Sequence, residues 1–328
     1  MGIFLSTNSL MNTVNTLHYQ ISDVASLDGH GYADKWMTVN GADASNTTLR
    51  KVYSGYRFDE SNAAVTTFTT PTTNPMRKSA TSTDGLDVMT TGGQTDTESN
   101  SAVVNQFRAI DSTVITKINS PQLTDGRQEA VGTASYRHSH FAIGGKQGTT
   151  IISSINAIHY DVLATTQAQG NLSGAGTNPR GCGNGRAAMY RHQDATFRDL
   201  EIINIADHTG GTYTSYISNV TATGTLLSGA SFLAAASSGD NAVWIGGTQI
   251  TAIRWDDSYS ESIWATSITN FNRGAADSDG TDIVFNGGTT SGSDAIYYIR
   301  AEQGNLNYRT SSQTLAEPIK QHSCIAYQ

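Results

Sequence analysis

A compact group of carboxylates is the first feature of the sequence that could do chemistry. Asp277, Asp279 and Asp282 fall within six residues around Gly280. Ca²⁺ takes oxygen ligands, and clustered acidic side chains can supply them, although this order differs from that of an EF-hand loop. Tight hairpin turns favour Asp and Gly for a different reason, since both tolerate the backbone angles that turns need. We therefore expect a turn here and at the related stretches around Gly85 and Gly239, and no bound metal.

Other side chains that enzymes use occur without a complete arrangement. His138 and His140 share one face of a strand and could begin a zinc site, but no third ligand lies near them. Asp59-Glu60 and Asp256-Asp257 are paired acids, whose catalytic use depends on a separation in space that sequence does not give. The chain has no G-x-S-x-G elbow and no phosphate loop, and residues 82–84 only begin a sialidase-type Asp-box. We expect a protein that is not an enzyme and has no cofactor, with a glycan-active hydrolase as the last alternative.

Six basic residues recur where a strand of small side chains begins. They are Lys35, Arg77, Arg127, Arg180, Arg273 and Lys320. One interpretation is structural, with each cation paired to backbone carbonyls or acids at the start of its strand. The other is functional, with the six forming a positive ring on one face that holds anionic sugar or phosphate groups. These six residues are the candidate binding site.

The elements that must position these cations form a repeat, which is clearest in residues 273–300. A small-residue run at 274–276 is followed by a turn, an apolar run that ends in Gly287-Gly288, and the aromatic strand 295–299. Gly-Gly directly after an apolar strand indicates a positive φ or a close backbone approach. The apolar run with Gly-Gly recurs at residues 88–93, 141–145 and 243–247, with degenerate copies at 52–56 and 188–192.

The aromatic strand sets the period of the repeat. Its landmark residues are Tyr19, Phe68, Phe107, Tyr160, Ile203, Trp255 and Tyr298. Tyr19 and Tyr298 are 279 positions apart over six intervals, so the mean period is about 46 to 47 residues. Units of roughly 40–50 residues with four strands are typical of β-propeller blades. We expect an all-β fold, a seven-bladed β-propeller of four-stranded antiparallel blades, as one domain over residues 1–328.

The order of elements resembles kelch-type repeats, most closely in residues 270–288. It is similar to the degenerate kelch-like repeats of structural proteins in tailed phages, and the resemblance spans almost the whole chain. It implies a non-enzymatic virion component of the tail, fibre or capsid decoration that binds another virion protein, and a host-surface receptor as a further partner. A lectin-like propeller that binds surface glycans is the alternative.

Composition narrows the class of protein. A net charge of −8 and a pI near 5.4 argue against nucleic acid as a partner. No run of 18 apolar residues is present to insert into a membrane, and residues 2–5 are too short for the apolar region of a signal peptide. Two cysteines do not make a disulfide scaffold. A polar, weakly charged chain without a signal peptide favours a virion protein made in the host cytoplasm.

The two ends of the chain are expected to close the ring. Residues 319–328, opened by Lys320, are a first strand with no unit after it, whereas residues 2–5 are a second strand with no first strand before it. Pairing the two would complete a blade and protect both edges. Cys182 and Cys324 both fall on innermost strands of separate blades, too far apart for a disulfide. Residues 315–322 are the one candidate helix.

Overall fold

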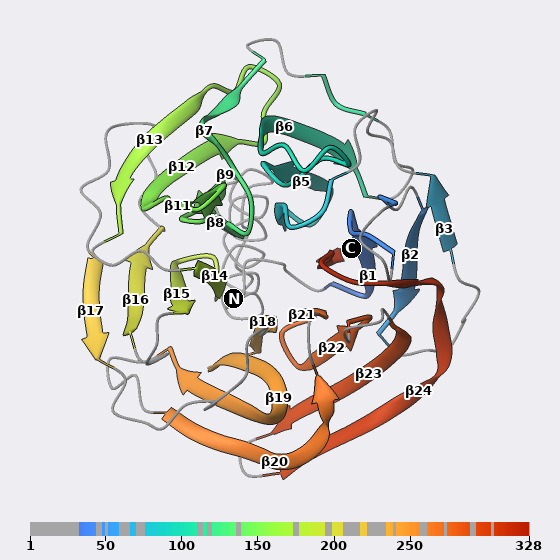
Figure 1. The fold of residues 1–328 in the computed structure, drawn as a ribbon. Coiled ribbons are helices and arrows are strands. Elements are labelled where there is room, and N and C mark those ends of the chain that lie inside the picture. The colour runs from blue at the N-terminus through green and yellow to red at the C-terminus, as the bar shows by residue number, and fades with distance from the viewer. Residues whose placement is uncertain are drawn as a thin grey trace, which may run out of the picture.

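A computed structural model of the chain describes residues 33–327, apart from several short ranges. Those ranges are 44–47, 50–51, 59–65, 70–75, 110–113, 117–119, 136–138, 173–176, 194–198, 206–216, 222–233, 239–240, 256–260, 272–273, 289–292 and 303–304. The described residues form antiparallel β-sheets and no helix. Six sheets of three or four strands lie around a common centre, each with one end strand innermost (Figure 1).

The first sheet joins strands from the two ends of the described chain. Its order from the centre outward is β25 (Ser323–Tyr327), β1 (Lys35–Val39), β2 (Val52–Arg57) and β3 (Thr66–Thr69). Five residue pairs run along β1 and β25, from Lys35 opposite Tyr327 to Val39 opposite Ser323. The C-terminal strand therefore pairs with β1, not with residues 2–5 as expected, which lie outside the described residues.

The other five sheets follow in chain order and keep the same plan. From the centre outward, the second sheet holds β4 (Ala80–Thr83), β5 (Asp87–Thr91), β6 (Ser101–Arg108) and β7 (Gln122–Arg127). The third sheet holds β8 (Val131–Ser135), β9 (Ser139–Ile143), β12 (Ser154–His159) and β13 (Thr166–Asn171). The fourth sheet holds β14 (Thr177–Gly183), β15 (Ala187–Gln193), β16 (Asp199–Asn204) and β17 (Ile217–Thr221). The fifth holds β18 (Ala234–Ser238), β19 (Asn241–Arg254) and β20 (Glu261–Phe271), and the sixth β21 (Ala275–Ser278), β22 (Asp282–Asn286), β23 (Ser293–Glu302) and β24 (Asn305–Ile319). A small hairpin of β10 (Lys146–Gln147) and β11 (Thr150–Ile151) separates β9 from β12. Because β24 runs to Ile319, the candidate helix at 315–322 is wrong.

The hairpin turns expected around Gly85 and Gly280 form between first and second strands, whereas the turn expected around Gly239 lies outside the described residues. Asp84 Oδ1 accepts hydrogen bonds from the backbone N–H groups of Leu86 and Asp87, at 3.0 and 2.8 Å. Asp279 does the same for Thr281 and Asp282, at 2.8 and 2.6 Å. Within each turn the glycine has a positive φ, 95° at Gly85 and 94° at Gly280. Side chains that bond backbone donors two or three residues ahead stabilise such turns, so Asp279 of the carboxylate cluster serves the hairpin.

The Gly-Gly pairs connect each sheet to the next. In the second sheet, Gly92 and Gly93 have φ of 63° and 103°, and Gly93 donates its N–H to Arg127 O at 2.6 Å, at the end of β7 and just before the third sheet. In the first sheet, Asn40 and Gly41 have φ of 59° and 114°, and Gly41 donates to Met76 O at 2.9 Å, just before the second sheet. Asn tolerates the left-handed region better than most residues, so Asn40-Gly41 replaces Gly-Gly.

This equivalence corrects the repeat count. The run at 52–56 was expected to be a second strand, but it belongs to β2, the third strand of its sheet, and β1 with Asn40-Gly41 is the second. The landmark of this sheet moves accordingly from Phe68, which lies on the fourth strand, to the third strand. Tyr19, counted as a further unit, lies outside the described residues. Those residues form six sheets of three or four strands, and the expected seven blades are not confirmed.

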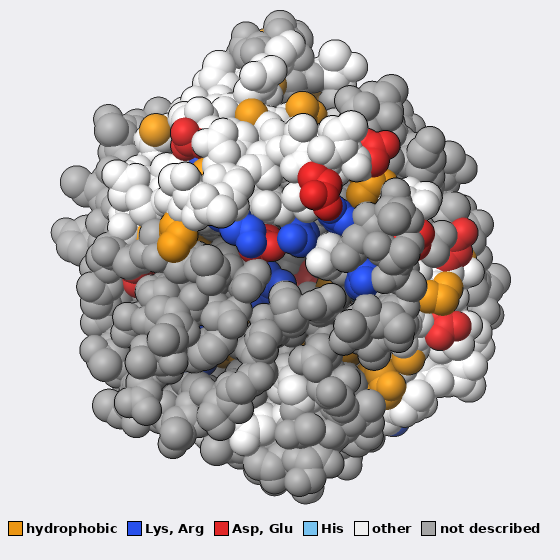
Figure 2. All heavy atoms as spheres, in the orientation of Figure 1, with side chains coloured by type: hydrophobic (Ala, Val, Ile, Leu, Met, Phe, Trp, Pro, Cys, Tyr) orange, Lys and Arg blue, Asp and Glu red, His pale blue; other side chains and the backbone are white. Residues whose placement is uncertain are grey.

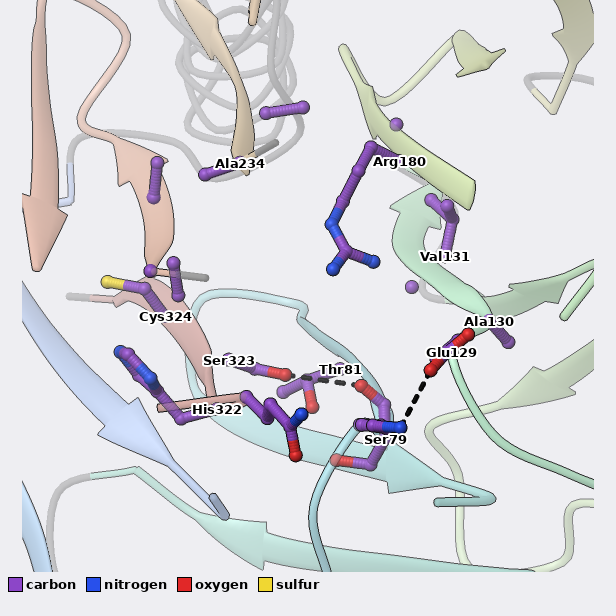
Figure 3. A pocket seen from close by; sticks show the side chains of 18 residues that line it. Ser79, Thr81, Glu129, Ala130, Val131, Arg180, Ala234, His322, Ser323 and Cys324 are labelled. Carbon is purple, nitrogen blue, oxygen red and sulfur yellow. Dashed lines mark hydrogen bonds and ion pairs between the residues drawn. The ribbon is translucent and has the colours of Figure 1, made fainter. Parts of the chain in front are cut away.

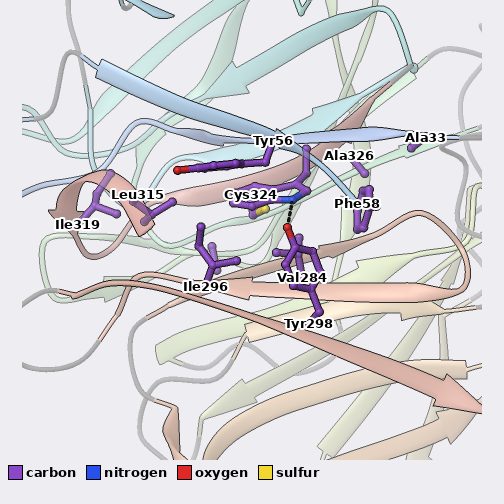
Figure 4. Close-up of a cluster of buried hydrophobic side chains, with 12 residues drawn as sticks. Ala33, Tyr56, Phe58, Val284, Ile296, Tyr298, Leu315, Ile319, Cys324 and Ala326 are labelled. Carbon is purple, nitrogen blue, oxygen red and sulfur yellow. Dashed lines mark hydrogen bonds between the residues drawn. The ribbon is translucent and has the colours of Figure 1, made fainter. Parts of the chain in front are cut away.

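Apolar side chains fill the six interfaces between neighbouring sheets. Each cluster of buried hydrophobic residues draws its members from two adjacent sheets, and the last cluster joins the sixth sheet to the first. In that cluster (Figure 4) Trp36 stacks on Tyr56 with ring centroids 5.1 Å apart and donates its indole N–H to Tyr298 Oη at 3.2 Å. Full burial of such a side chain contributes about 1.5–3 kcal/mol. Because each cluster spans two sheets, the hydrophobic core of the described residues lies between neighbouring sheets.

The innermost strands complete the closure. Their contacts run in one cycle, β4 to β8, β14, β18, β21, β25 and back to β4. Glycine makes the closest approach possible, since a Cβ on Gly132 of β8 would lie 2.2 Å from Thr81 N of β4. The expectation that small-residue runs such as 234–236 and 274–276 lie innermost is confirmed by the positions of β18 and β21.

Candidate functional site

A central cavity opens where the six inner strands begin. About 140 Å³ of it can hold the centres of water molecules, and every inner strand contributes to its lining. A narrower space of about 50 Å³ continues below it. Both are lined by Thr81, Gly132, Gly181, Ala235, Ala276 and Cys324. The cavity and this space therefore form one channel that narrows toward the interior.

An ion-paired carboxylate lies in the cavity lining. Glu129 Oε1 is 2.8 Å from Lys78 Nζ, and Glu129 Oε2 is 2.9 Å from Lys146 Nζ. Glu129 itself is only 5% exposed. Burial raises the pKa of Glu129, but the charges and hydrogen bonds of Lys78 and Lys146 outweigh burial and leave that pKa below its usual value. Glu129 is therefore ionised at neutral pH, and its two oxygens hold both ammonium groups in place.

Arg180 supplies a third cation. It lies on β14, and its guanidinium points into the cavity from the side opposite His322 and Ser323 (Figure 3). Burial lowers the pKa of Arg180, and the nearby charge of Glu129 opposes that shift. A guanidinium keeps its proton in proteins, so Arg180 stays charged. Lys78, Lys146 and Arg180 thus face one carboxylate.

Three residues at the cavity mouth have left-handed backbones. Lys78, Glu129 and Gln321 have φ of 58°, 62° and 55°. They are linked by their backbones, because Lys78 N–H donates to Gln321 O at 2.9 Å and Glu129 N–H donates to Lys78 O at 2.8 Å. Each such conformation costs on the order of 1–3 kcal/mol and persists where its surroundings enforce it. Three of the six non-glycine residues with positive φ among the described residues therefore lie at the cavity mouth.

Apart from Glu129 Oε2, which is ion-paired with Lys146, three polar atoms of the cavity lining have no hydrogen-bond partner among the described residues. They are Thr81 Oγ1, Gln321 Oε1 and His322 Nδ1, and all three are buried. His322 Nε2 lies 2.6 Å from Asn286 Oδ1, and Asn286 Nδ2 donates to Cys324 Sγ at 3.1 Å. Burial lowers the pKa of His322 to about 3, so the ring is neutral. Because Nε2 must donate to Asn286 Oδ1, Nδ1 is an acceptor.

The structure places the expected basic residues in two kinds of surroundings. Arg127 is fully buried, and it donates to Ser154 O at 2.8 Å, Gly144 O at 3.1 Å and Ser154 Oγ at 2.6 Å. Burial lowers the pKa of Arg127 to about 10, which still leaves it charged at neutral pH. Arg77 is 4% exposed and bonds to Gln94 and Glu98, both at 3.0 Å. For these two residues the structural interpretation is correct.

The remaining expected residues do not share one position. Lys35 begins β1, the second strand of its sheet, and pairs with Asp34 at 3.2 Å, so its expected place at the start of an inner strand is wrong. Lys320 holds that place in the same sheet, is 3% exposed and pairs its backbone with Ala42. Arg273 lies outside the described residues. Of the six, Arg180 alone is seen in the cavity lining within the described ranges.

Lys78, Glu129 and Lys146 are not among the candidate residues expected from the sequence. The signal that could have found them is their position beside expected features. Lys78 follows Arg77, Glu129 follows Arg127 by two residues, and Lys146 follows Gly144-Gly145. Figure 2 shows Lys and Arg side chains gathered around the hollow at the centre of one face, with an acidic side chain among them.

The other candidates fall elsewhere. His140 is fully buried, with Ser82 Oγ 2.7 Å from Nδ1 and Thr91 Oγ1 2.9 Å from Nε2, whereas His138 lies outside the described residues. Asp59-Glu60 and Asp256-Asp257 also lie outside them. Across the described ranges no group of three His, Cys, Asp or Glu side chains is placed to hold a metal ion. Cys182 and Cys324 are free thiols on the inner strands β14 and β25, as their positions predicted.

Two further findings bear on the class of protein. In the part of the chain that the structure covers, no helix is long and apolar enough to cross a membrane. No protein-family model matches the sequence, and no curated protein is significantly similar to it.

Proposed function

We propose that the ring of sheets is a six-bladed β-propeller and that the protein is a non-enzymatic interaction protein. Six separate sheets, six apolar interfaces and one cycle of inner strands support this architecture. In propellers a rigid scaffold carries its function on the loops and cavity at the ends of the ring. The site, more than the fold, must therefore identify the function.

One observation carries the proposal: all six inner strands line a cavity whose mouth is cationic. Lys78, Lys146 and Arg180 surround the single carboxylate of Glu129 there. The chain as a whole has a net charge of −8, so a gathering of cations at one place is local and specific. A binding surface for an acidic partner is the simplest use of this face.

The biological setting follows from the kelch-like repeat at residues 270–288. We place the protein in the virion of a tailed phage, in the tail, fibre or capsid decoration, where its partner is another virion protein. A second candidate is receptor recognition, with the central cavity binding a host-surface glycan. The concave cavity, with its charged and polar side chains converging at the mouth, favours this candidate, because small-molecule sites are concave and carry a few convergent polar groups.

Cross-linking in assembled particles tests the virion role. An amine-reactive cross-linker applied to purified particles should join Lys78 or Lys146, both 21% exposed, to a neighbouring virion protein. Lys35 is the matched control, since its side chain is 33% exposed and it lies on β1, outside the cavity lining. The protein's absence from purified particles, or cross-links through Lys35 alone, would overturn the proposal.

A further inference from the structure

The charges of the cavity suit a carboxylate ligand. Glu129 already holds an ammonium group on each oxygen, so it does not attract a further cation. Lys78 Nζ uses one donor on Glu129 and another on Gln128 Oε1 at 3.4 Å, which leaves one of its three. Arg180 presents a planar fork of donors that matches a carboxylate with two parallel hydrogen bonds. An anionic group between Lys78 and Arg180 would meet both.

The uncharged polar atoms require hydrogen-bond donors on the ligand as well. His322 Nδ1 and Gln321 Oε1 can only accept, and Thr81 Oγ1 can both donate and accept. A buried acceptor without a partner costs about 1–3 kcal/mol, so a ligand that supplies donors removes this cost. A simple inorganic anion has few donors at neutral pH. A molecule that carries hydroxyl groups beside its anionic group has several.

The shape of the cavity sets the size and the direction of the ligand. The deeper space holds about 50 Å³ against about 140 Å³ for the upper part, and its lining is mostly small residues such as Gly132 and Ala235, with Asp277 as its one acidic residue among those described. A compact group fits the upper part, and any longer chain must continue toward the solvent. The end of an oligosaccharide has this form.

We propose that the central cavity binds an acidic sugar residue at the end of a glycan, with its carboxylate at Arg180 and Lys78. Its hydroxyl groups meet Thr81, Gln321 and His322. The inference rests on the receptor-recognition candidate above and names the ligand class of the same cavity. Free acidic sugars share this chemistry, so the test includes both free sugars and glycan ends.

Ligand-observed NMR with the full-length protein tests the inference directly. The probes are glucuronate, galacturonate and N-acetylneuraminate, each free and as the end of an oligosaccharide, with glucose and inorganic phosphate for comparison. At least one acidic sugar should bind at least tenfold more tightly than both glucose and phosphate. Equal binding of phosphate would reduce the site to a simple anion site, and binding of glucose alone would remove the role of the cations. Either result, or no binding, overturns the inference.

Substitutions locate the binding in the cavity. Arg180→Met should weaken the binding of the acidic sugar by roughly 10- to 100-fold, because a charge-assisted bidentate contact is lost. Thr81→Val should weaken it by about 3- to 10-fold. The matched control is Arg300→Met on β23, whose side chain is 55% exposed, and it should bind as the wild type does. Unchanged binding in a folded Arg180→Met variant would contradict the assignment.

Different results would contradict the virion role and the acidic-sugar ligand. A protein that binds no acidic sugar but cross-links to a virion partner through Lys78 or Lys146 retains the virion role and loses the ligand. A protein that binds an acidic sugar in an Arg180-dependent way, yet is absent from particles, retains the ligand and loses the virion role.

Discussion

Arg127 and Arg180 are both basic residues near the opening of an inner strand. Arg127 lies among the packed sheets, which we call the wall of the ring, whereas Arg180 lines the central cavity. Arg127 ends β7 of the second sheet, is fully buried, and bonds to two backbone carbonyls and a hydroxyl of the neighbouring third sheet. Arg180 points into the central space (Figure 3). The same residue type therefore stabilises the scaffold at one place and faces a candidate ligand at the other.

Distance from the hairpin turn explains the difference. Asp84 and Asn184 occupy equivalent turns, since each accepts hydrogen bonds from the backbone two and three residues ahead. Arg77, another wall residue, lies seven positions before Asp84, whereas Arg180 lies four positions before Asn184. Arg180 is thus three residues further along its inner strand. A shift of three places moves the side chain from the wall to the cavity.

Removing the last inner strand should have the largest effect on the wall. Deletion of residues 320–328 removes β25, its five pairs with β1 and the contacts that close the ring against β4 and β21. Trp36, Val284 and Tyr298 would lose neighbours in the cluster that joins the sixth sheet to the first. We expect loss of cooperative unfolding by circular dichroism and calorimetry throughout the ring, beyond fraying of one end.

Removal of Gln328 alone is the control for this deletion and should leave the melting temperature unchanged. If the longer deletion also keeps the melting temperature of the full chain, the ring is closed by other elements than β25.

Substitution of Arg127, the arginine of the wall, should cause the next largest loss in the free energy of unfolding. Arg127→Met removes the charged donor that Gly144 O has in the buried interior and one of the two donors of Ser154 O, which keeps the backbone N–H of Gly144 at 3.2 Å. An unsatisfied buried polar group costs about 1–3 kcal/mol, so we expect a loss of about 3 kcal/mol in the free energy of unfolding. Urea unfolding measures it, and Arg108→Met, at a side chain 50% exposed, is the comparison. A loss below about 1 kcal/mol would show that Arg127 does not differ from a surface arginine.

Much of the wall could be predicted from the sequence because local backbone demands select residue types. Gly85 and Gly93 require positive φ, and Asp84 fits the turn, so these positions can be recognised from the sequence alone. The first unit was misaligned because Asn40-Gly41 meets the same demand without the Gly-Gly pattern. Misplacing that unit was enough to change the count of sheets.

The cavity could be predicted only in part. Arg180 was found because it is basic and precedes a small-residue run, but its direction depends on its distance from Asn184. Lys78, Glu129 and Lys146 come from two neighbouring sheets, and their ion pairs form only when the ring closes. The same closure brings Gln321 and His322, with their two buried acceptors, to the cavity lining. Such long-range juxtapositions leave no periodic signal.

His322 lies on the boundary between wall and cavity, and its pKa predicts a pH dependence of intermediate size. The folded pKa of about 3 lies below the usual value of 6.5, so between these values the unfolded chain binds more protons. The free energy of unfolding should therefore fall as pH drops from about 6.5 toward 3, by up to about 1.4 kcal/mol per pH unit from this group. His322→Gln, which keeps an amide donor for Asn286, should remove that slope. Urea unfolding at several values between pH 5 and 7 compares the two proteins, and equal slopes would contradict the assignment.

The smallest effect on stability should come from the cavity arginine. Arg180→Met removes a charge whose burial is unfavourable, as the lowered pKa of Arg180 indicates, and replaces it with an apolar side chain of similar length. Replacing buried charges by apolar groups of similar volume is often neutral or stabilising. We therefore expect a change of no more than about 1 kcal/mol in the free energy of unfolding, against about 3 kcal/mol for Arg127→Met. Both variants are measured by the same urea titration. Equal losses would mean that Arg180 is a second structural brace, and the division between wall and cavity would no longer hold.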